Sequence, residues 1–388
     1  MVIAALVVVQ LVRTVPAQSA APAPAPSVVV PGGAALPWPP TGQGAVAISD
    51  VGGIRTSGPQ QPAPIASLAK MMTAYLVLQD HPLTAGETGP SIPISSADVA
   101  TYAADLAASD SVLQVTLGES LTEQQALEAL LVPSADNIAQ LLAQWDSGSV
   151  AAFVAKMNTT AQGLGMTHTT YTDPSGLSAS TVSTASDQVV MARTAMANPV
   201  FASIVGMGSA TFPVGGTVQN YDYEVGHDGI IGIKTGSDSA AGGCWAFAAQ
   251  RTIAGTAHTV YGVVLGVAAT SLGLLEPALT AGVTLANAVP YSVRLITALP
   301  AGSVVGYIDA PWRTRIPITT VTAMKGLAQA GHAVTFVVHL SQPGGRTVYA
   351  GEPMGTVTTP DVVGVDSSRL MVGRSGSGPS LQWRLTRR

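Results

Sequence analysis

A serine and a lysine stand three residues apart in an apolar stretch of this chain. In IASLAKMMTAYLVL, residues 65–78, the spacing of Ser67 and Lys70 puts both side chains on one face of a helix. A serine hydroxyl is a weak nucleophile until a base takes its proton, and a lysine can be that base if desolvation favours its neutral form. Ser-x-x-Lys alone occurs by chance in many proteins. The chain has only four lysines, however, and this stretch carries no other charge before Asp80.

A second lysine ends an apolar segment, DGIIGIKTG, which is typical of a strand. Lys234 and Thr235 together could hold a carboxylate, and Gly236 would let a substrate approach the backbone closely. The alternative is a lysine that reaches solvent from a strand end beside a turn.

A third element, LLVPSADNIAQLL, places Ser134, Asp136 and Asn137 between two predicted helices. A purely structural interpretation is sound here, because Ser134 suits an N-cap position and Asp136 suits a first helical turn. Capping and function can coexist, so all three side chains are candidate site residues.

Composition argues against several other functions. The chain is 47% hydrophobic and 10% charged, with a net charge of −5 and no basic run, so nucleic acid is not an expected partner. The single cysteine, Cys244, excludes an intrachain disulfide framework. The six histidines show no zinc-binding spacing, so we expect neither a metal nor a cofactor. The sequence contains no Gly-x-Ser-x-Gly elbow, so a Ser-His-Asp hydrolase is not expected.

Periodicity and turn signals predict the elements that position these residues. Ser120 and Glu123 are expected to form a capping box at the start of the second helix, and a further helix is considered at MKGLAQAG, residues 324–331. The principal helices are predicted over 65–80, 120–133, 136–146, 151–165, 184–199 and 274–289. Strands are predicted over 45–53, 228–236, 244–252 and 259–267.

The chain is predicted to have four parts. MVIAALVVVQLV is too short for a transmembrane helix and resembles the apolar core of a signal peptide, so residues 1–13 are interpreted as the remnant of a signal or anchor. A buried N-terminal strand is the alternative. Residues 14–40 form a Pro/Ala-rich linker, 41–290 the main domain, and 291–388 a small β-rich domain.

In this order, Ser67-x-x-Lys70, Ser134-x-Asp136 and Lys234-Thr-Gly resemble the motifs of the serine D-Ala-D-Ala carboxypeptidases, the low-molecular-mass penicillin-binding proteins of peptidase family S11. Segments such as LGMTHTTYTDPSGL extend the similarity over roughly residues 43–290, and the Ala-rich, Lys-poor composition looks actinobacterial. The resemblance implies an α+β class. The fold would be penicillin-binding protein/β-lactamase-like, with an antiparallel sheet, a helical subdomain and a C-terminal β-rich domain.

The resemblance also implies roles for individual residues. Ser67 would be the acylated nucleophile, Lys70 its general base, and Ser134 the relay that carries a proton to the leaving D-alanine. The backbone N–H groups of Ser67 and Ser237 would form the oxyanion hole, and Lys234 with Thr235 would bind the terminal carboxylate. The substrate-binding residues implied are Asp136, Asn137, Lys234, Thr235, Gly236 and Ser237.

Two positions depart from the family pattern. Asp136 stands where the family has asparagine, and an ionised aspartate can only accept hydrogen bonds and favours a protonated Lys70. Asn137 is one residue further on, and a small register shift could let it serve. Ser237 and Asp238 follow Lys-Thr-Gly where many members of the family have His or Ser followed by Thr, which should matter little because the site uses a backbone group there.

The expected protein is an exported D,D-carboxypeptidase, secreted or tethered to the membrane by its N-terminus. It would act on peptidoglycan stem peptides through a serine acyl-enzyme, with β-lactams as inhibitors. A D,D-endopeptidase with the same residues is the nearest rival, and a penicillin-binding wall scaffold with poor turnover is another. A β-lactamase fits less well, because Glu128 is followed by Ala-Leu-Leu and the Glu-x-x-Leu-Asn segment is absent.

Overall fold

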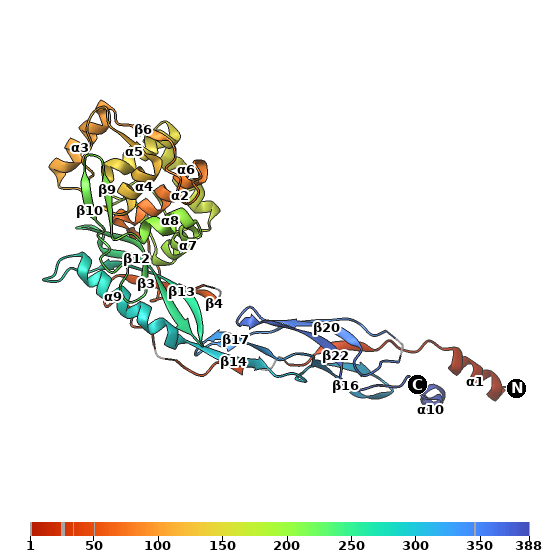
Figure 1. Cartoon of the computed structure of the whole chain (residues 1–388). Helices are drawn as coiled ribbons and strands as arrows, with labels where there is room; N and C mark the ends of the chain where they lie inside the picture. The colour runs from red at the N-terminus through yellow and green to blue at the C-terminus, as the bar shows by residue number, and fades with distance from the viewer. Residues whose placement is uncertain (1, 25–27, 34, 50, 345–346, 388) are drawn as a thin grey trace. The chain divides into compact units, whose positions relative to one another are not determined.

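The computed structural model describes residues 2–24, 28–33, 35–49, 51–344 and 347–387. Two compact units divide the chain (Figure 1). The first, which we call the mixed unit, comprises Ala35–Ser49 and Gly53–Pro290. The second, the β unit, comprises Met1–Ala34, Asp50–Gly52 and Tyr291–Arg388. All the candidate site residues belong to the mixed unit.

A five-stranded sheet lies at the centre of the mixed unit, in the order β11-β12-β13-β3-β4. Neighbouring strands from β11 to β3 pair antiparallel. The strands are β3 (Gln43–Ile48), β4 (Val51–Thr56), β11 (Ile230–Asp238), β12 (Gly242–Ile253) and β13 (Thr256–Val267). The strands predicted around these positions are confirmed, and β11 with its Lys-Thr-Gly sequence forms one edge of the sheet.

The two faces of the sheet have different partners, as β12 shows. Successive side chains alternate between faces. Ala246 and Ala248 join the large apolar core shared with the helices, and their small size lets helices pack closely against the sheet. Trp245 lies on the other face, beside α9 (Leu275–Ala288), where Gly282 leaves room for its ring because a Cβ there would lie 2.3 Å from it.

A block of helices covers the sheet face that carries these alanines, as Figure 1 shows. Apolar residues at helical spacing and N-capping side chains define most of these helices, and the predicted helices are confirmed. The block contains η1 (Ala66–Ala69), α2 (Lys70–Asp80), α3 (Ser96–Ala108), α4 (Glu123–Leu131), α5 (Asp136–Ser147), α6 (Val150–Gly163), α7 (Ala185–Met196) and α8 (Pro199–Val205). Short strand pairs join β5 (Ala63–Pro64) to β8 (Val182–Ser183), β6 (Ser91–Pro93) to β7 (Ser120–Thr122), and β9 (Ser209–Phe212) to β10 (Gly216–Gln219).

The N-terminus of α4 differs from the prediction. The prediction of a capping box formed by Ser120 and Glu123 was wrong, because Ser120 is extended and paired in β7. Thr122 and Gln125 form the box instead, and both of their reciprocal hydrogen bonds are present. Glu123 is therefore the first helical residue, with its side chain buried rather than used as a cap.

The β unit is built mainly from strands, as the sequence predicted for residues after 290. Its largest sheet has the order β1-β15-β16-β22-β20-β19, and smaller ones are β14-β17-β21 and β18-β2. The strands after residue 290 are β14 (Val293–Leu299), β15 (Val304–Ala310), β16 (Arg313–Thr320), β17 (Met324–Gln329), β18 (Ala333–Val334), β19 (Val337–Leu340), β20 (Pro353–Thr358), β21 (Val363–Val365) and β22 (Ser367–Val372). The short helices are η2 (Val289–Ser292) and α10 (Leu381–Thr386). Most of MKGLAQAG forms strand β17, so the prediction of a helix at this segment was wrong. Pairing with β14 and β21 overrides its local composition.

The segment predicted as a linker contributes strands to this unit. β1 (Ser19–Pro22) pairs with β15, and β2 (Val28–Val29) pairs with β18. An extended Ala/Pro backbone can add to a sheet edge, where the missing proline N–H groups cost little. Before it, α1 (Val2–Val12) is a short apolar helix. None of the helices in the described part of the chain is long and apolar enough to cross a membrane.

The four lysines lie in contrasting surroundings. Lys70 and Lys234 are fully buried in the mixed unit. Lys156 is half-buried and forms ion pairs with Asp80 and Asp146. Lys325 is exposed on β17.

Candidate active site

Ser67 lies on a tight corner that leads into α2. Because η1 runs directly into this helix, Ser67 and Lys70 stay on one side of a continuous helical backbone. Lys70 Nζ lies 2.8 Å from Ser67 Oγ. The preceding residue, Ala66, has a φ of 46°, a left-handed conformation that side-chain-bearing residues rarely adopt and that is found at functional sites. The serine and the lysine expected to act together are thus in hydrogen-bond contact.

Lys70 is surrounded by oxygen atoms of four residues, which come from three parts of the chain. Besides Ser67, its Nζ contacts Asp136 Oδ1 at 2.5 Å, Ser134 Oγ at 3.3 Å and the carbonyl oxygen of Ser175 at 3.2 Å. The lysine side chain is fully buried and that of Asp136 is almost so. Burial raises the pKa of Asp136, and the adjacent Lys70 opposes that shift. The site therefore contains a buried ion pair in direct contact with the candidate nucleophile.

Ser134 reaches this centre from a strained junction between α4 and α5. Its φ is 62°, so it cannot be the helical cap that the sequence predicted. The N-cap position of α5 is Ala135, without a side-chain cap bond. The backbone turn instead directs the Ser134 hydroxyl towards Lys70, and the first helical residue, Asp136, follows it into the site.

Asn137 lies apart from the lysine. Its side-chain amide donates to the Leu113 carbonyl at 2.9 Å, and its Oδ1 accepts the Leu113 N–H at 3.0 Å. Both of its polar atoms are thus used to hold the segment before β7. The structure gives the position beside Lys70 to Asp136 and gives Asn137 an anchoring contact.

Lys234 is a second buried lysine, on edge strand β11. Its Nζ donates to the Thr235 carbonyl at 3.0 Å. Burial lowers its pKa to about 7; the charge of Lys70 lowers it too, whereas Asp136 and Asp222 act in the opposite direction. Its side chain is therefore close to the Ser67–Lys70 centre and can gain a proton when an anion binds.

Asp222 is the further acid that acts on Lys234. Its Oδ2 accepts the Trp245 indole N–H at 2.8 Å, while its Oδ1 has no hydrogen-bond partner in the described chain. Burial raises its pKa to about 6, against the opposing hydrogen bond from Trp245. Sequence reasoning missed this residue, because the chain between β10 and β11 carries no recognisable motif.

Gly236 explains how β11 can lie against the nucleophile. A Cβ at this position would lie 2.9 Å from the Ser67 backbone nitrogen and 3.2 Å from the Ala66 Cβ. The missing side chain thus lets the corner that holds Ser67 pack against the strand, and a role of this glycine in admitting a substrate stays a prediction. Thr235 is buried next to it, and Ser237 is exposed one residue beyond.

A turn that the sequence marked only as DPSGL supports the other side of Lys70. Asp173 Oδ2 accepts the N–H groups of Ser175, Gly176 and Leu177 at 3.2, 2.7 and 3.0 Å. Gly176 packs so closely below the corner that a Cβ would lie 1.8 Å from the Ala66 carbonyl oxygen. The turn thereby presents the Ser175 carbonyl to Lys70, a contact between residues 105 positions apart that no local signal indicates.

The described residues contain no group of three or more His, Cys, Asp or Glu side chains that could hold a metal ion. The polar centre is made of serine hydroxyls, two lysines and carboxylates. This arrangement can activate a serine and bind an anion.

Comparison with known proteins identifies relatives of the mixed unit. A family described as D-alanyl-D-alanine carboxypeptidase, Peptidase_S11, matches residues 52–268. The D-alanyl-D-alanine carboxypeptidase DacB2 of Mycobacterium tuberculosis is 37% identical over 236 residues, which cover 59% of this chain and 75% of that protein. A D-alanyl-D-alanine carboxypeptidase of a Streptomyces species is 31% identical over 227 residues, covering 54% and 74%.

A solved structure extends the likeness of fold. The crystal structure of the D-alanyl-D-alanine carboxypeptidase DacD from Francisella tularensis matches with a TM-score of 0.63 and 19% identity, over 92% of this chain and 97% of that one.

Proposed function

The chain belongs to the D-alanyl-D-alanine carboxypeptidase family, peptidase family S11, and we propose that Ser67 is its catalytic nucleophile. The protein is accordingly a serine-type carboxypeptidase that hydrolyses the terminal D-Ala-D-Ala bond of peptidoglycan stem peptides and binds penicillin. The observation that carries the residue assignment is the 2.8 Å contact between Lys70 Nζ and Ser67 Oγ.

In the acylation step, Ser67 Oγ attacks the carbonyl carbon of the penultimate D-alanine while the neutral form of Lys70 takes the hydroxyl proton. The C–N bond then breaks, and the terminal D-alanine leaves as an amine. Ser134 lies 3.3 Å from Lys70, so the proton can return through its hydroxyl to the leaving nitrogen. Attack of water on the resulting ester releases the shortened peptide and restores Ser67.

The backbone N–H groups of Ser67 and Ser237 would stabilise the negative charge that develops on the carbonyl oxygen. The close approach at Gly236 supports this role, because it brings β11 against the Ser67 backbone. Lys234 and Thr235, at the neighbouring positions of the same strand, would bind the terminal carboxylate of the substrate. Because Lys234 has a pKa of about 7 before the anion arrives, the bound carboxylate would favour its charged form.

The direct test is to incubate the protein with benzylpenicillin and determine the intact mass and the labelled peptide. We expect one adduct, on a peptide that contains Ser67, and no adduct in Ser67→Ala. An adduct elsewhere, or none, would overturn the assignment.

The substrate test is release of free D-alanine from diacetyl-Lys-D-Ala-D-Ala. Release is the expected result. If a crosslinked peptide dimer is cleaved and the linear peptide is not, the protein is a D,D-endopeptidase. Acylation without turnover of either substrate identifies a penicillin-binding scaffold.

We place this activity outside the cytoplasm, where peptidoglycan lies. Residues 1–13 would direct export or attach the chain to the membrane surface, residues 41–290 would form the catalytic domain, and residues 291–388 would form a separate β-rich domain. The two-unit division of the chain supports the boundary near residue 290, and the pairing of β1 and β2 supports counting part of 14–40 with the second domain.

A further inference from the structure

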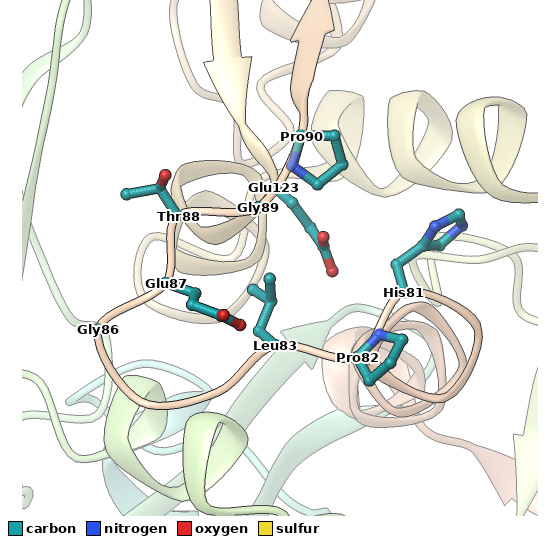
Figure 2. A pocket seen from close by; sticks show the side chains of 9 residues that line it. All are labelled: His81, Pro82, Leu83, Gly86, Glu87, Thr88, Gly89, Pro90 and Glu123. Atoms are coloured by element: carbon teal, nitrogen blue, oxygen red, sulfur yellow. The ribbon is translucent and has the colours of Figure 1, made fainter.

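A pocket of the mixed unit lies at the opposite end of α2 from Lys70. The helix runs from Lys70 to Asp80, and an α-helix of this length spans about 15 Å. The pocket has a volume of about 580 Å³ and is lined by His81–Leu83, Gly86–Pro90 and Glu123. Figure 2 shows the Glu123 carboxyl group at its centre, between His81 and Leu83.

Glu123 is the unusual residue of this pocket. It is 0% exposed, and neither carboxyl oxygen has a hydrogen-bond partner among the described residues. Helix capping does not explain it, because Thr122 and Gln125 form the capping box. The backbone N–H groups of Glu123 and Gln124 donate to the carbonyls of Pro90 and Thr88, so they do not serve the carboxyl group either.

The charges around Glu123 leave it uncompensated. Glu87 lines the same pocket, and its Oε2 accepts the Thr84 N–H at 2.8 Å. His81 faces Asp146 at 3.5 Å, and its ring stacks on Trp145. Lys156, on α6, is held by Asp80 and Asp146.

The other titratable group on α4, Glu128, is bonded to Gln124. No lysine or arginine is among the residues that line the pocket. A cationic ligand therefore suits this pocket, whereas an anion would meet two glutamates.

We propose that this pocket binds a protonated primary amine, with the ammonium group hydrogen-bonded to the Glu123 carboxylate and the alkyl chain against Pro82, Leu83 and Pro90. An ammonium group has three donors, and the two free oxygens of Glu123 are strong acceptors. A metal ion fits less well, because the described residues contain no group of three side chains that could ligate one.

Binding should depend on pH in a defined direction. Burial raises the pKa of Glu123 to about 7, so below that pH the free pocket holds a neutral acid. An ammonium group favours the ionised form, and binding then releases a proton. Affinity should rise by up to about tenfold per pH unit towards neutral pH and level off above it.

The test uses the full-length protein and n-butylammonium chloride in calorimetric titration. We expect saturable binding to the wild type and to Glu128→Gln, a matched variant on the same helix whose side chain is bonded elsewhere. Glu123→Gln should bind at least about tenfold more weakly, since a charged hydrogen bond is lost. Butan-1-ol, the neutral analogue, should not bind. Titrations in two buffers of different ionisation enthalpy should show proton release below neutral pH.

Equal binding to Glu123→Gln would show a general attraction to the acidic surface and overturn the proposal. Absence of saturable binding to the wild type would also overturn it and leave Glu123 as a buried neutral acid. Penicillin acylation of Ser67 serves as the folding control, and we expect it to be unchanged in both variants. The outcome is therefore independent of the proposed catalytic residues.

Discussion

Asp136 occupies the position at which the resemblance to the family leads us to expect asparagine. Its carboxylate lies 2.5 Å from Lys70 Nζ, and both side chains are buried. Removing one partner of a buried ion pair usually destabilises a protein, because the other charge is left uncompensated. Here Lys70 retains Ser67, Ser134 and the Ser175 carbonyl as neighbours, so the lysine is not left without acceptors.

Asp136→Asn should therefore accelerate acylation near neutral pH. The amide restores a hydrogen-bond donor at this position, and loss of the negative charge disfavours the ammonium form of Lys70. The rising limb of the pH–rate profile for penicillin acylation should move to lower pH. Asp110→Asn, which removes a carboxylate that acts on Asp136 without contacting Lys70, is the control and should shift the limb less. A slower mutant with an unmoved limb would show that the ion pair itself is needed.

Removal of the Lys234 side chain should lower kcat/KM more for substrates that have a free terminal carboxylate than for substrates that lack one. A charged hydrogen bond contributes roughly 1.5 to 3 kcal/mol, so Lys234→Ala should lower kcat/KM about tenfold to a hundredfold. A C-terminally amidated peptide should lose much less. Comparable losses on both peptides would give Lys234 only a structural role.

The wild-type pH dependence provides a second measurement on Lys234. Its pKa is lowered to about 7, so the free enzyme loses this positive charge as pH rises through that value. KM for the carboxylate substrate should increase above neutral pH, whereas KM for the amide should not.

For individual residues, the sequence predicted those contacts that follow from a short spacing along the chain or from a recognisable motif. Ser67 and Lys70 meet because three residues separate them on one helical backbone. The choice between Asp136 and Asn137 depended on the exact start of α5 and on a contact with Leu113, and neither is encoded locally.

Among the elements, the turn at residues 173–177 contacts the site directly, because its Ser175 carbonyl accepts a hydrogen bond from Lys70. Asp173→Asn should weaken penicillin acylation and lower Tm, because an amide cannot replace a carboxylate that accepts several N–H groups. Each charged hydrogen bond contributes about 1.5 to 3 kcal/mol, so a tenfold or greater loss of acylation rate is expected. Ser180→Ala, in the same loop but bonded only to Thr172 and Ser178, should change the rate little. Normal acylation in a less stable Asp173→Asn would limit the turn to a structural role.

The start of α4 leads to a prediction about stability. The folded pKa of Glu123 is about 7, above its ordinary value of 4.5. Its contribution to stability is therefore fully present below pH 4.5 and is lost as pH rises to about 7. At alkaline pH, Glu123→Gln should unfold at a higher urea concentration than the wild type, with a free energy of unfolding larger by roughly 1 to 3 kcal/mol. In acid the two proteins should unfold at similar urea concentrations. An equal difference at both pH values would contradict this assignment.

The elements themselves were largely predictable, and the errors have physical causes. Amphipathic helices and the strands of the central sheet follow from hydrophobic spacing. The capping box at Ser120 failed because β6 pairs with that residue, and MKGLAQAG became a strand because β14 and β21 lie beside it. Local composition also gives no sign of strands β1 and β2 within the segment predicted as a linker, since partners hundreds of residues away decide their pairing.

For the whole molecule, the mixed unit should fold without the β unit. The large core around the site is made entirely of residues from the mixed unit, while two smaller cores are made of β-unit residues. A chain shortened to residues 35–290 should unfold cooperatively in urea and be acylated at Ser67 at a rate within about threefold of the full-length protein. Loss of cooperative unfolding or of acylation would show that the β unit is required for the active conformation.

The placement of the lysines makes the protein a selective target for amine-reactive reagents. Among the lysine side chains, Lys325 is the exposed one, Lys156 is occupied by two carboxylates, and Lys70 and Lys234 are buried. Among the lysines, a bulky activated ester should therefore attach a fluorophore or a solid support mainly to Lys325 and leave Lys70 and Lys234 unmodified. A small reagent that reaches Lys234 should find its amine unusually nucleophilic near neutral pH, because a pKa of about 7 leaves much of it uncharged. Protection of Lys234 from that reagent would then report any ligand bound beside this side chain, whether or not the ligand is turned over.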